Sequence, residues 1–204
     1  MKRFETLLVL TILATSGAGR AEAQSQRILG SDTLRAALRF MQPDVDFMTG
    51  MIAHHAQAVT MARWAPSHGA SPTVQTLCAR IINAQGDEIV LMQNWLHDKQ
   101  QPVPEPDPRG MHMAGMAGPM LMPGMLSPQQ MAQLDSARGM RFDELFLRYM
   151  IQHHHGAVGM VNHLFDQGAG EEETVNKFAL GVFADQTTEI ARMQGLLATL
   201  VFSH

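Results

Sequence analysis

Two pairs of adjacent histidines are the residues of this chain whose type and spacing most directly suggest chemistry. His54 and His55 lie in the stretch DVDFMTGMIAHHAQAVTM, and His153 and His154 lie in DELFLRYMIQHHHGAVGM. The second stretch begins 99 positions after the first and repeats its Met-Ile, His-His, Ala-Val and Met residues at the same places. Such an internal repeat predicts two copies of one structural unit. Neutral imidazole is a common metal ligand, so the repeat also predicts a duplicated candidate site.

A glutamate follows each histidine pair at a similar distance. Glu88 and Glu189 each lie in a Q-x-x-E-I-x-x-M stretch. On a helix, both glutamates would occupy the middle of an apolar stripe. Burying an unpaired carboxylate is costly, so we expect each glutamate to pair with an inward histidine or to bind a metal.

Helical geometry separates the two histidines of each pair. Successive residues on an α-helix are about 100° apart, so His54 and His55 would straddle the buried stripe and face different neighbouring helices. The same holds for His153 and His154, whereas His155 would point toward solvent. The histidines expected at the surface because they fall in loops or off the stripes are His68, His97, His163 and His204.

Methionine is the unusual component of the composition, with 17 residues. Several methionines lie on or beside the buried stripes and are candidate sulfur ligands, although packing alone explains each of them. They are Met51, Met61, Met92, Met150, Met160 and Met193.

A segment rich in Pro, Gly and Met joins the two copies of the repeat. Within it, six methionines and one histidine fall in 15 residues: Met111, His112, Met113, Met116, Met120, Met122 and Met125. The segment lacks helical periodicity, so packing on a helix does not explain these methionines. Thioether and imidazole ligands together suit Cu(I). A promiscuous hydrophobic contact surface is the alternative.

The pattern of caps and breakers predicts an all-α protein. Pro43 and Pro72 would open two long helices, Ser127 with Gln130 forms a capping box, and Gly168 would end a third long helix. The expected helices cover residues 31–42, 43–65, 72–99, a short stretch after 127, 141–167 and 171–202. We therefore predict a ferritin-like antiparallel four-helix bundle built from two duplicated helical hairpins, each with a short leading helix. The halves would be residues 24–100 and 127–204, joined by a linker at 101–126.

The N-terminus and the charge limit the functional classes. Residues 1–23 have two early basic residues, a short apolar run and an A-x-A pattern, which predict a secretory signal peptide and a periplasmic or extracellular location. The apolar run is too short for an integral membrane anchor. A formal net charge of -4 without basic clusters gives no reason to expect nucleic-acid binding. The single cysteine, Cys78, allows no internal disulfide.

The paired motifs M-I-x-H-H-x-x-A-V-x-M and Q-x-x-E-I-x-x-M resemble the DUF305 family. They occur twice, and the resemblance covers most of residues 44–200. It implies a ferritin-like four-helix fold and export from bacteria, and the family includes periplasmic copper-binding members of the CopM type. The family's His-His motif maps onto the pairs at 54–55 and 153–154, and His155 is an addition to it.

These patterns favour an exported metal-binding protein that holds copper, as Cu(I), for sequestration or for transfer to a copper-delivery or efflux partner. Iron fits less well, because di-iron bundles use four carboxylates and Glu-x-x-His motifs. This chain offers Glu88 and Glu189, plus Asp44 and Asp143 at the helix starts, and has no Glu-x-x-His. Zinc hydrolases of the HExxH type are also excluded. A ferritin-like di-iron or copper oxidoreductase, and a metal-free bundle with buried Glu–His networks, remain alternatives, and the sequence leaves the oligomeric state open.

Overall fold

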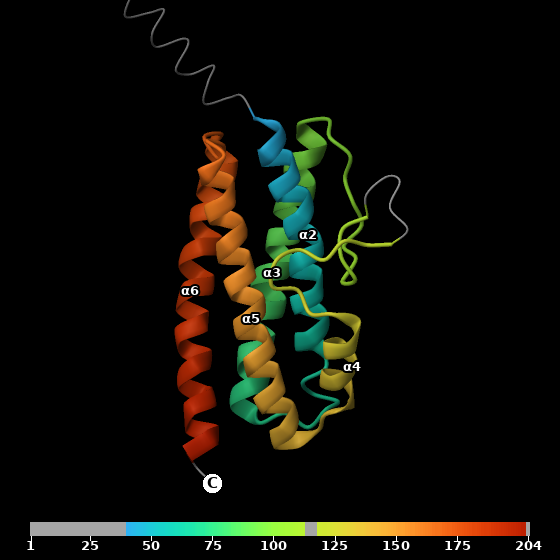
Figure 1. Cartoon of the computed structure of the whole chain (residues 1–204), viewed down its shortest axis with the longest axis vertical. Helices are drawn as coiled ribbons and strands as arrows, with labels where there is room; N and C mark the ends of the chain where they lie inside the picture. Colours follow the sequence, from blue (N-terminus) through green and yellow to red (C-terminus); the bar gives the residue numbers. More distant parts are fainter. Residues whose placement is uncertain (1–39, 113–117, 203–204) are drawn as a thin grey trace, which may run out of the picture.

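The described part of the chain, residues 40–112 and 118–202 of a computed structural model, is mainly helical, with non-helical linker segments at residues 99–112 and 118–127 (Figure 1). Apart from one isolated antiparallel bridge between Met111 and Met120, these residues form no β-structure. The predicted leading helix at 31–42 falls almost entirely outside the described residues. The helices are α2 (Gln42–Arg63), α3 (Pro72–Asp98), α4 (Pro128–Ser136), α5 (Gly139–Asp166) and α6 (Glu173–Phe202).

The four long helices form two antiparallel hairpins, as the repeat predicts. Helix α2 packs along α3, α5 packs along α6, and the two hairpins meet mainly through α2 and α5. Figure 1 shows the short helix α4 beside the lower end of α2, and the linker running along the outer side of α2 before it turns back toward α5. The predicted all-α four-helix arrangement is confirmed.

The predicted caps account for several helix boundaries. The Ser71 hydroxyl accepts a hydrogen bond from the Val74 N–H at 3.4 Å, which caps α3 ahead of Pro72. Ser127 and Gln130 form the expected capping box of α4, with bonds of 2.9 and 3.2 Å. Each cap satisfies backbone donors that a helix start leaves without intrahelical partners.

Two buried aspartates tie the halves together. The Asp44 carboxylate, in α2, accepts a 2.7 Å bond from the Gly170 N–H, which lies just before α6. The Asp143 carboxylate, in α5, accepts from the Ser71 N–H at 3.2 Å, just before α3. Both side chains are thus engaged by backbone donors of the opposite half, and they stabilise the docking of the hairpins.

The core consists of two apolar clusters with a polar layer between them. One cluster includes Met48, Ile52 and Phe178, and the other includes Phe142 and Phe146. Buried polar side chains lie halfway along the long helices, where the clusters meet. They are His54, His55, Gln85, His153, His154 and Gln186.

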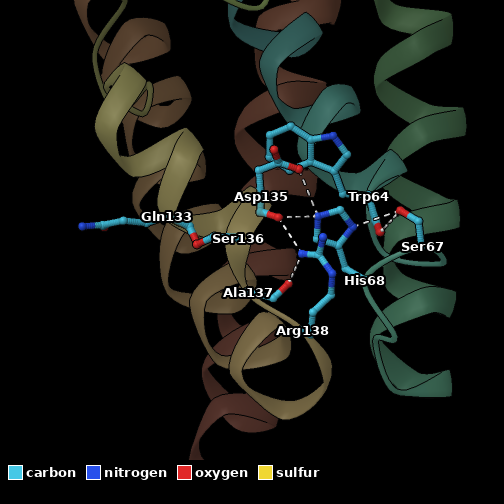
Figure 2. A network of polar contacts seen from close by, with 8 residues as sticks. All are labelled: Trp64, Ser67, His68, Gln133, Asp135, Ser136, Ala137 and Arg138. Atoms are coloured by element: carbon cyan, nitrogen blue, oxygen red, sulfur yellow. Dashed lines mark hydrogen bonds and ion pairs between the residues drawn. The ribbon is translucent and has the colours of Figure 1, made fainter.

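His68 is buried, so the prediction that it lies at the surface is wrong. It is only 5% exposed, because α4 and the start of α5 cover the turn between α2 and α3. Figure 2 shows its ring between Ser67 and Asp135. The Ser67 hydroxyl lies 2.9 Å from Nδ1, and the Asp135 carbonyl oxygen lies 2.9 Å from Nε2. The Trp64 ring stacks on it, with centroids 5.8 Å apart. His68 therefore anchors α4 to the end of the first hairpin.

Candidate metal centre

The four histidines of the repeated pairs lie together in the polar layer, and none is exposed. As the helical angles predict, the two members of each pair face different helices. His55 Nε2 lies 2.8 Å from Glu88 Oε2 on α3, and His154 Nε2 lies 2.7 Å from Glu189 Oε2 on α6. His54 instead faces His153 across the α2–α5 contact, with ring centroids 3.7 Å apart.

The hydrogen bonds of these rings determine which nitrogen carries the proton. A carboxylate can only accept, so His55 and His154 donate from Nε2 to their glutamates. His54 donates from Nε2 to the carbonyl oxygen of Pro123 at 3.0 Å. Among residues 40–112 and 118–202, the Nδ1 atoms of all three rings find no hydrogen-bond partner, and neither ring nitrogen of His153 finds one.

Unpaired buried nitrogens are costly unless something binds them. In the neutral ring, the bare Nδ1 carries a lone pair that can bind a metal, while the carboxylate on the opposite nitrogen fixes the ring orientation. The donor set of the polar layer therefore fits a metal that accepts imidazole nitrogen.

Burial keeps the two facing histidines neutral. Loss of solvation, followed by the effect of His55, lowers the pKa of His54 to about 3. Loss of solvation, followed by the effect of His54, holds the pKa of His153 well below its usual value. Neutral imidazole is the form that binds metals, so both rings are competent ligands at neutral pH.

Glu88 and Glu189 pair with inward histidines as predicted, but they do not lie in the centre of the core. Their side chains are 23% and 18% exposed. Both line a groove of about 380 Å³ between α3 and α6, which admits water to the outer side of each carboxylate. The fully buried positions nearby belong instead to Gln85 and Gln186, both 3% exposed. The repeated Q-x-x-E motif contained these glutamines, but we assigned them no role from the sequence.

The helical methionines pack into the two apolar clusters on either side of the histidine layer. Met160 is partly buried and packs against one cluster. The others are fully buried: Met51, Met61, Met92, Met150 and Met193. Within residues 40–112 and 118–202, no group of three or more His, Cys, Asp or Glu side chains is arranged as a metal-binding cluster.

The linker methionines fall into different environments. Met111 and Met120 are partly exposed and pair through two backbone bonds of 2.9 and 2.8 Å. The exposed His112 lies 2.7 Å from the Asp107 carboxylate. Met122 and Met125 are buried, and Met113 and Met116 lie outside the described residues. The structure therefore separates an outer part of the linker from an inner part.

The inner part, residues 122–126, forms a strap across α2 and α5. The Pro123 carbonyl lies against Gly156 of α5, where any Cβ atom would overlap it. On α2, a Cβ at Gly50 would lie 2.9 Å from the Met122 sulfur. The Gln57 side chain binds the Leu126 backbone through bonds of 2.6 and 3.1 Å. The strap thus covers the side of the layer at which His54 lies.

A comparison with known protein families matches residues 44–197 to DUF305, a domain of unknown function. The chain belongs to the DUF305 family. The matched range contains both histidine pairs, both glutamates and the whole strap.

Solved DUF305 structures have the same fold. A DUF305 protein of Streptomyces coelicolor, described as a candidate secreted protein, is 28% identical with a TM-score of 0.66, covering 78% of this chain and 93% of that one. A DUF305 fragment from Deinococcus radiodurans is 30% identical with a TM-score of 0.65, covering 78% of this chain and 98% of that one. CopM in its Cu(II)-bound form is 28% identical with a TM-score of 0.61, and the match covers 76% of this chain and 96% of CopM. CopM has also been solved with Cu(I) and with Ag.

A shorter match links the chain to an uncharacterised protein of Acanthamoeba polyphaga mimivirus. The two are 33% identical over 57 residues, which is 28% of this chain and 38% of the viral protein. Among the helices that the structure describes, none combines the length and the apolar character needed to span a bilayer.

Proposed function

We propose that this DUF305 protein is exported and binds copper, as Cu(I), in its histidine layer for sequestration or transfer in the cell envelope. One observation carries the proposal: within the part of the chain that the structure describes, four fully buried imidazoles each leave a ring nitrogen without a hydrogen-bond partner. In three of the rings, the opposite nitrogen donates a hydrogen bond to a carboxylate or carbonyl oxygen. This is the pattern of metal-ligating histidines held by surrounding carboxylates and carbonyls.

The surroundings of the layer favour a soft metal ion. His54 and His153 supply facing neutral rings, and both apolar clusters that flank the layer contain buried methionines. Imidazole and thioether ligands together select Cu(I). The similarity to CopM, at 26% identity to its Cu(I)-bound form, supports the same choice of metal.

The linker would supply a first contact for copper. Met111 and Met120 are partly exposed, and His112 is exposed beside them. The buried methionines of the strap, Met122 and Met125, follow this outer part in the chain, and Pro123 between them contacts His54. Copper captured at the outer methionines would then pass to the histidine layer, or from the layer to an envelope partner.

An anaerobic titration of the apo protein with Cu(I), against a coloured chelator, tests the proposal. Changing His54 and His153 to glutamine removes the facing rings and should lower the number of Cu(I) ions bound. The matched control changes His97 and His163, both exposed, and should leave it unchanged. Equal stoichiometry in both variants would contradict a histidine-layer site.

The role of the linker needs a separate variant, because deleting the strap would also disturb packing. Replacing Met111, Met113, Met116 and Met120 by leucine removes the outer sulfur ligands and keeps the strap. Slower Cu(I) uptake, or lower stoichiometry, is the expected result. Unchanged uptake and stoichiometry would remove the outer linker from the copper pathway.

The competing function is a metal-free bundle, and the two Glu–His bonds favour it. Such pairs can fix the alignment of helices without any ligand. In that case, the change of His54 and His153 to glutamine would lower the melting temperature of the apo protein, while neither the variant nor the parent would bind Cu(I) against the chelator.

A further inference from the structure

The groove between α3 and α6 is a feature that the copper proposal does not use. It is lined by residues of these two helices, one from each hairpin, and its volume is about 380 Å³. The residues that matter for its chemistry are Arg80, Gln85, Glu88, Asp185, Gln186 and Glu189.

Three carboxylates make the groove negative. Glu88 and Glu189 each use Oε2 for a histidine, and both side chains remain partly open to the groove. Asp185 is exposed at its edge. Arg80 is the one basic residue among those lining the groove, so the carboxylates outnumber the positive charge.

The two buried glutamines point to a ligand independently of this charge. Gln85 and Gln186 are both 3% exposed, and both line the groove. Gln85 Oε1, and both polar atoms of the Gln186 side chain, have no hydrogen-bond partner among the described residues. An unpaired buried amide is destabilising. A bound ion with its water shell would satisfy these atoms.

The repeat brings equivalent donors from both halves to this place. Gln85 and Glu88 from α3 correspond to Gln186 and Glu189 from α6, each 101 positions later. The groove is therefore lined by two copies of one Gln–Glu unit, one from each hairpin.

We propose that this groove binds a hydrated divalent cation through oxygen donors, at a second metal site separate from the histidine layer. Carboxylate and amide oxygens suit hard ions such as Ca²⁺, Mg²⁺ and Mn²⁺, and these ions commonly keep part of their water shell. Cu(I) is instead selected by nitrogen and sulfur. The two sites therefore differ in the metals that they bind, although Glu88 and Glu189 contact both.

Mn²⁺ is a suitable probe, because electron paramagnetic resonance measures the free ion directly. The full mature chain, freed of metal, should bind about one Mn²⁺ in the groove. Changing Glu88 and Glu189 to glutamine should weaken this binding by about tenfold or more. Asp87→Asn is the matched control, because Asp87 neighbours Glu88 on α3 but lies outside this groove. Absent Mn²⁺ binding, or equal losses in both variants, would overturn the proposal.

A measurement on the unaltered protein tests the same site without relying on variants that could misfold. Bound Mn²⁺ broadens nearby NMR signals, so the side-chain amides of Gln85 and Gln186 should broaden first. The side chain of Gln93, also on α3, donates to the Pro104 carbonyl oxygen outside the groove and should change less. Broadening confined to other residues would place the ion elsewhere and reject the groove.

Gln186→Leu separates this site from the copper site, because it leaves both Glu–His bonds in place. The variant should bind Mn²⁺ more weakly and keep its Cu(I) stoichiometry. Unchanged Mn²⁺ affinity would count against the groove site alone. Absent Cu(I) binding in the unaltered chain, with Mn²⁺ binding intact, would instead reject the copper proposal alone.

Discussion

The imidazole rings of His54 and His153 face each other 3.7 Å apart between α2 and α5, although 99 positions separate them in the chain. Neither ring is exposed, and their low pKa values keep both neutral. Among the described residues, His54 Nδ1 and both ring nitrogens of His153 have no hydrogen-bond partner. The pair is thus suited to a metal and unsuited to protons, since each positive charge would disfavour the other.

The first prediction concerns the effect of pH on the apo protein. His54 and His153 have lower pKa values folded than unfolded, so the unfolded state takes up more protons below about pH 6.5. The free energy of unfolding should therefore be constant above this pH and fall as the pH decreases toward the folded values. At about pH 5, the contribution of each of these histidines should lower the free energy of unfolding by up to about 2 kcal/mol. Urea unfolding at several pH values measures this.

Two variants assign this pH dependence to the layer. Changing His153 to asparagine should reduce the loss of stability between neutral pH and about pH 5. Changing the exposed His97 to asparagine should leave it as it is. If both variants keep the full dependence, other groups cause it.

The second prediction concerns the strap. In Gly156→Ala, the new methyl group would overlap the Pro123 carbonyl, which also accepts the His54 hydrogen bond. The clash should lower the free energy of unfolding by about 1–3 kcal/mol. Gly159→Ala, one turn further on in α5, has open space at the Cβ and should instead raise it by about 0.5–1 kcal/mol. Chemical unfolding measures the free energy of unfolding of both variants. If Gly159→Ala also destabilises the protein, the loss in Gly156→Ala is not specific to the strap, because α5 then tolerates no added methyl group.

The third prediction separates stability from copper binding. His68→Ala removes the buried contacts to Ser67 and Asp135, and it should destabilise the protein by about 1–3 kcal/mol. The His68 side chain lies outside the polar layer, so Cu(I) stoichiometry should not change. His97→Ala, at a side chain that is 83% exposed, is the control and should change stability by less than about 0.5 kcal/mol. Lost copper binding in His68→Ala would mean that its turn takes part in the site.

The sequence predicted the parts of the structure that depend on local periodicity. Pro72, Ser71 and the Ser127 capping box begin helices where expected. The 100° step between neighbours correctly predicted that His54 and His55 face different helices. It also predicted that each glutamate would meet an inward histidine. These relationships follow from the spacing of residues within one helix, and the same spacing occurs in both halves of the chain.

Features that depend on tertiary contacts were not predicted. His68 lies in a turn, and the packing of α4 and the start of α5 buries it. The glutamates occupy the middle of apolar stripes, yet the groove between α3 and α6 leaves them half-buried.

The strap could have been inferred from places where the two copies of the repeat differ. Gly50 corresponds to Tyr149, and Gln57 corresponds to Gly156. Gly50, Gln57 and Gly156 all contact the strap. A linker that crosses only one side of a symmetric bundle requires such differences, because the two sides then have different neighbours.

The central claim, that the histidine layer binds Cu(I), is tested most directly by X-ray absorption at the copper edge. The sample is the purified protein loaded anaerobically with one equivalent of Cu(I). The account predicts nitrogen neighbours with the outer-shell scattering of imidazole, with or without sulfur, and the loss of this scattering when His54 and His153 are changed to glutamine. A spectrum with sulfur neighbours alone, unchanged in that variant, would contradict it and place the copper at methionines.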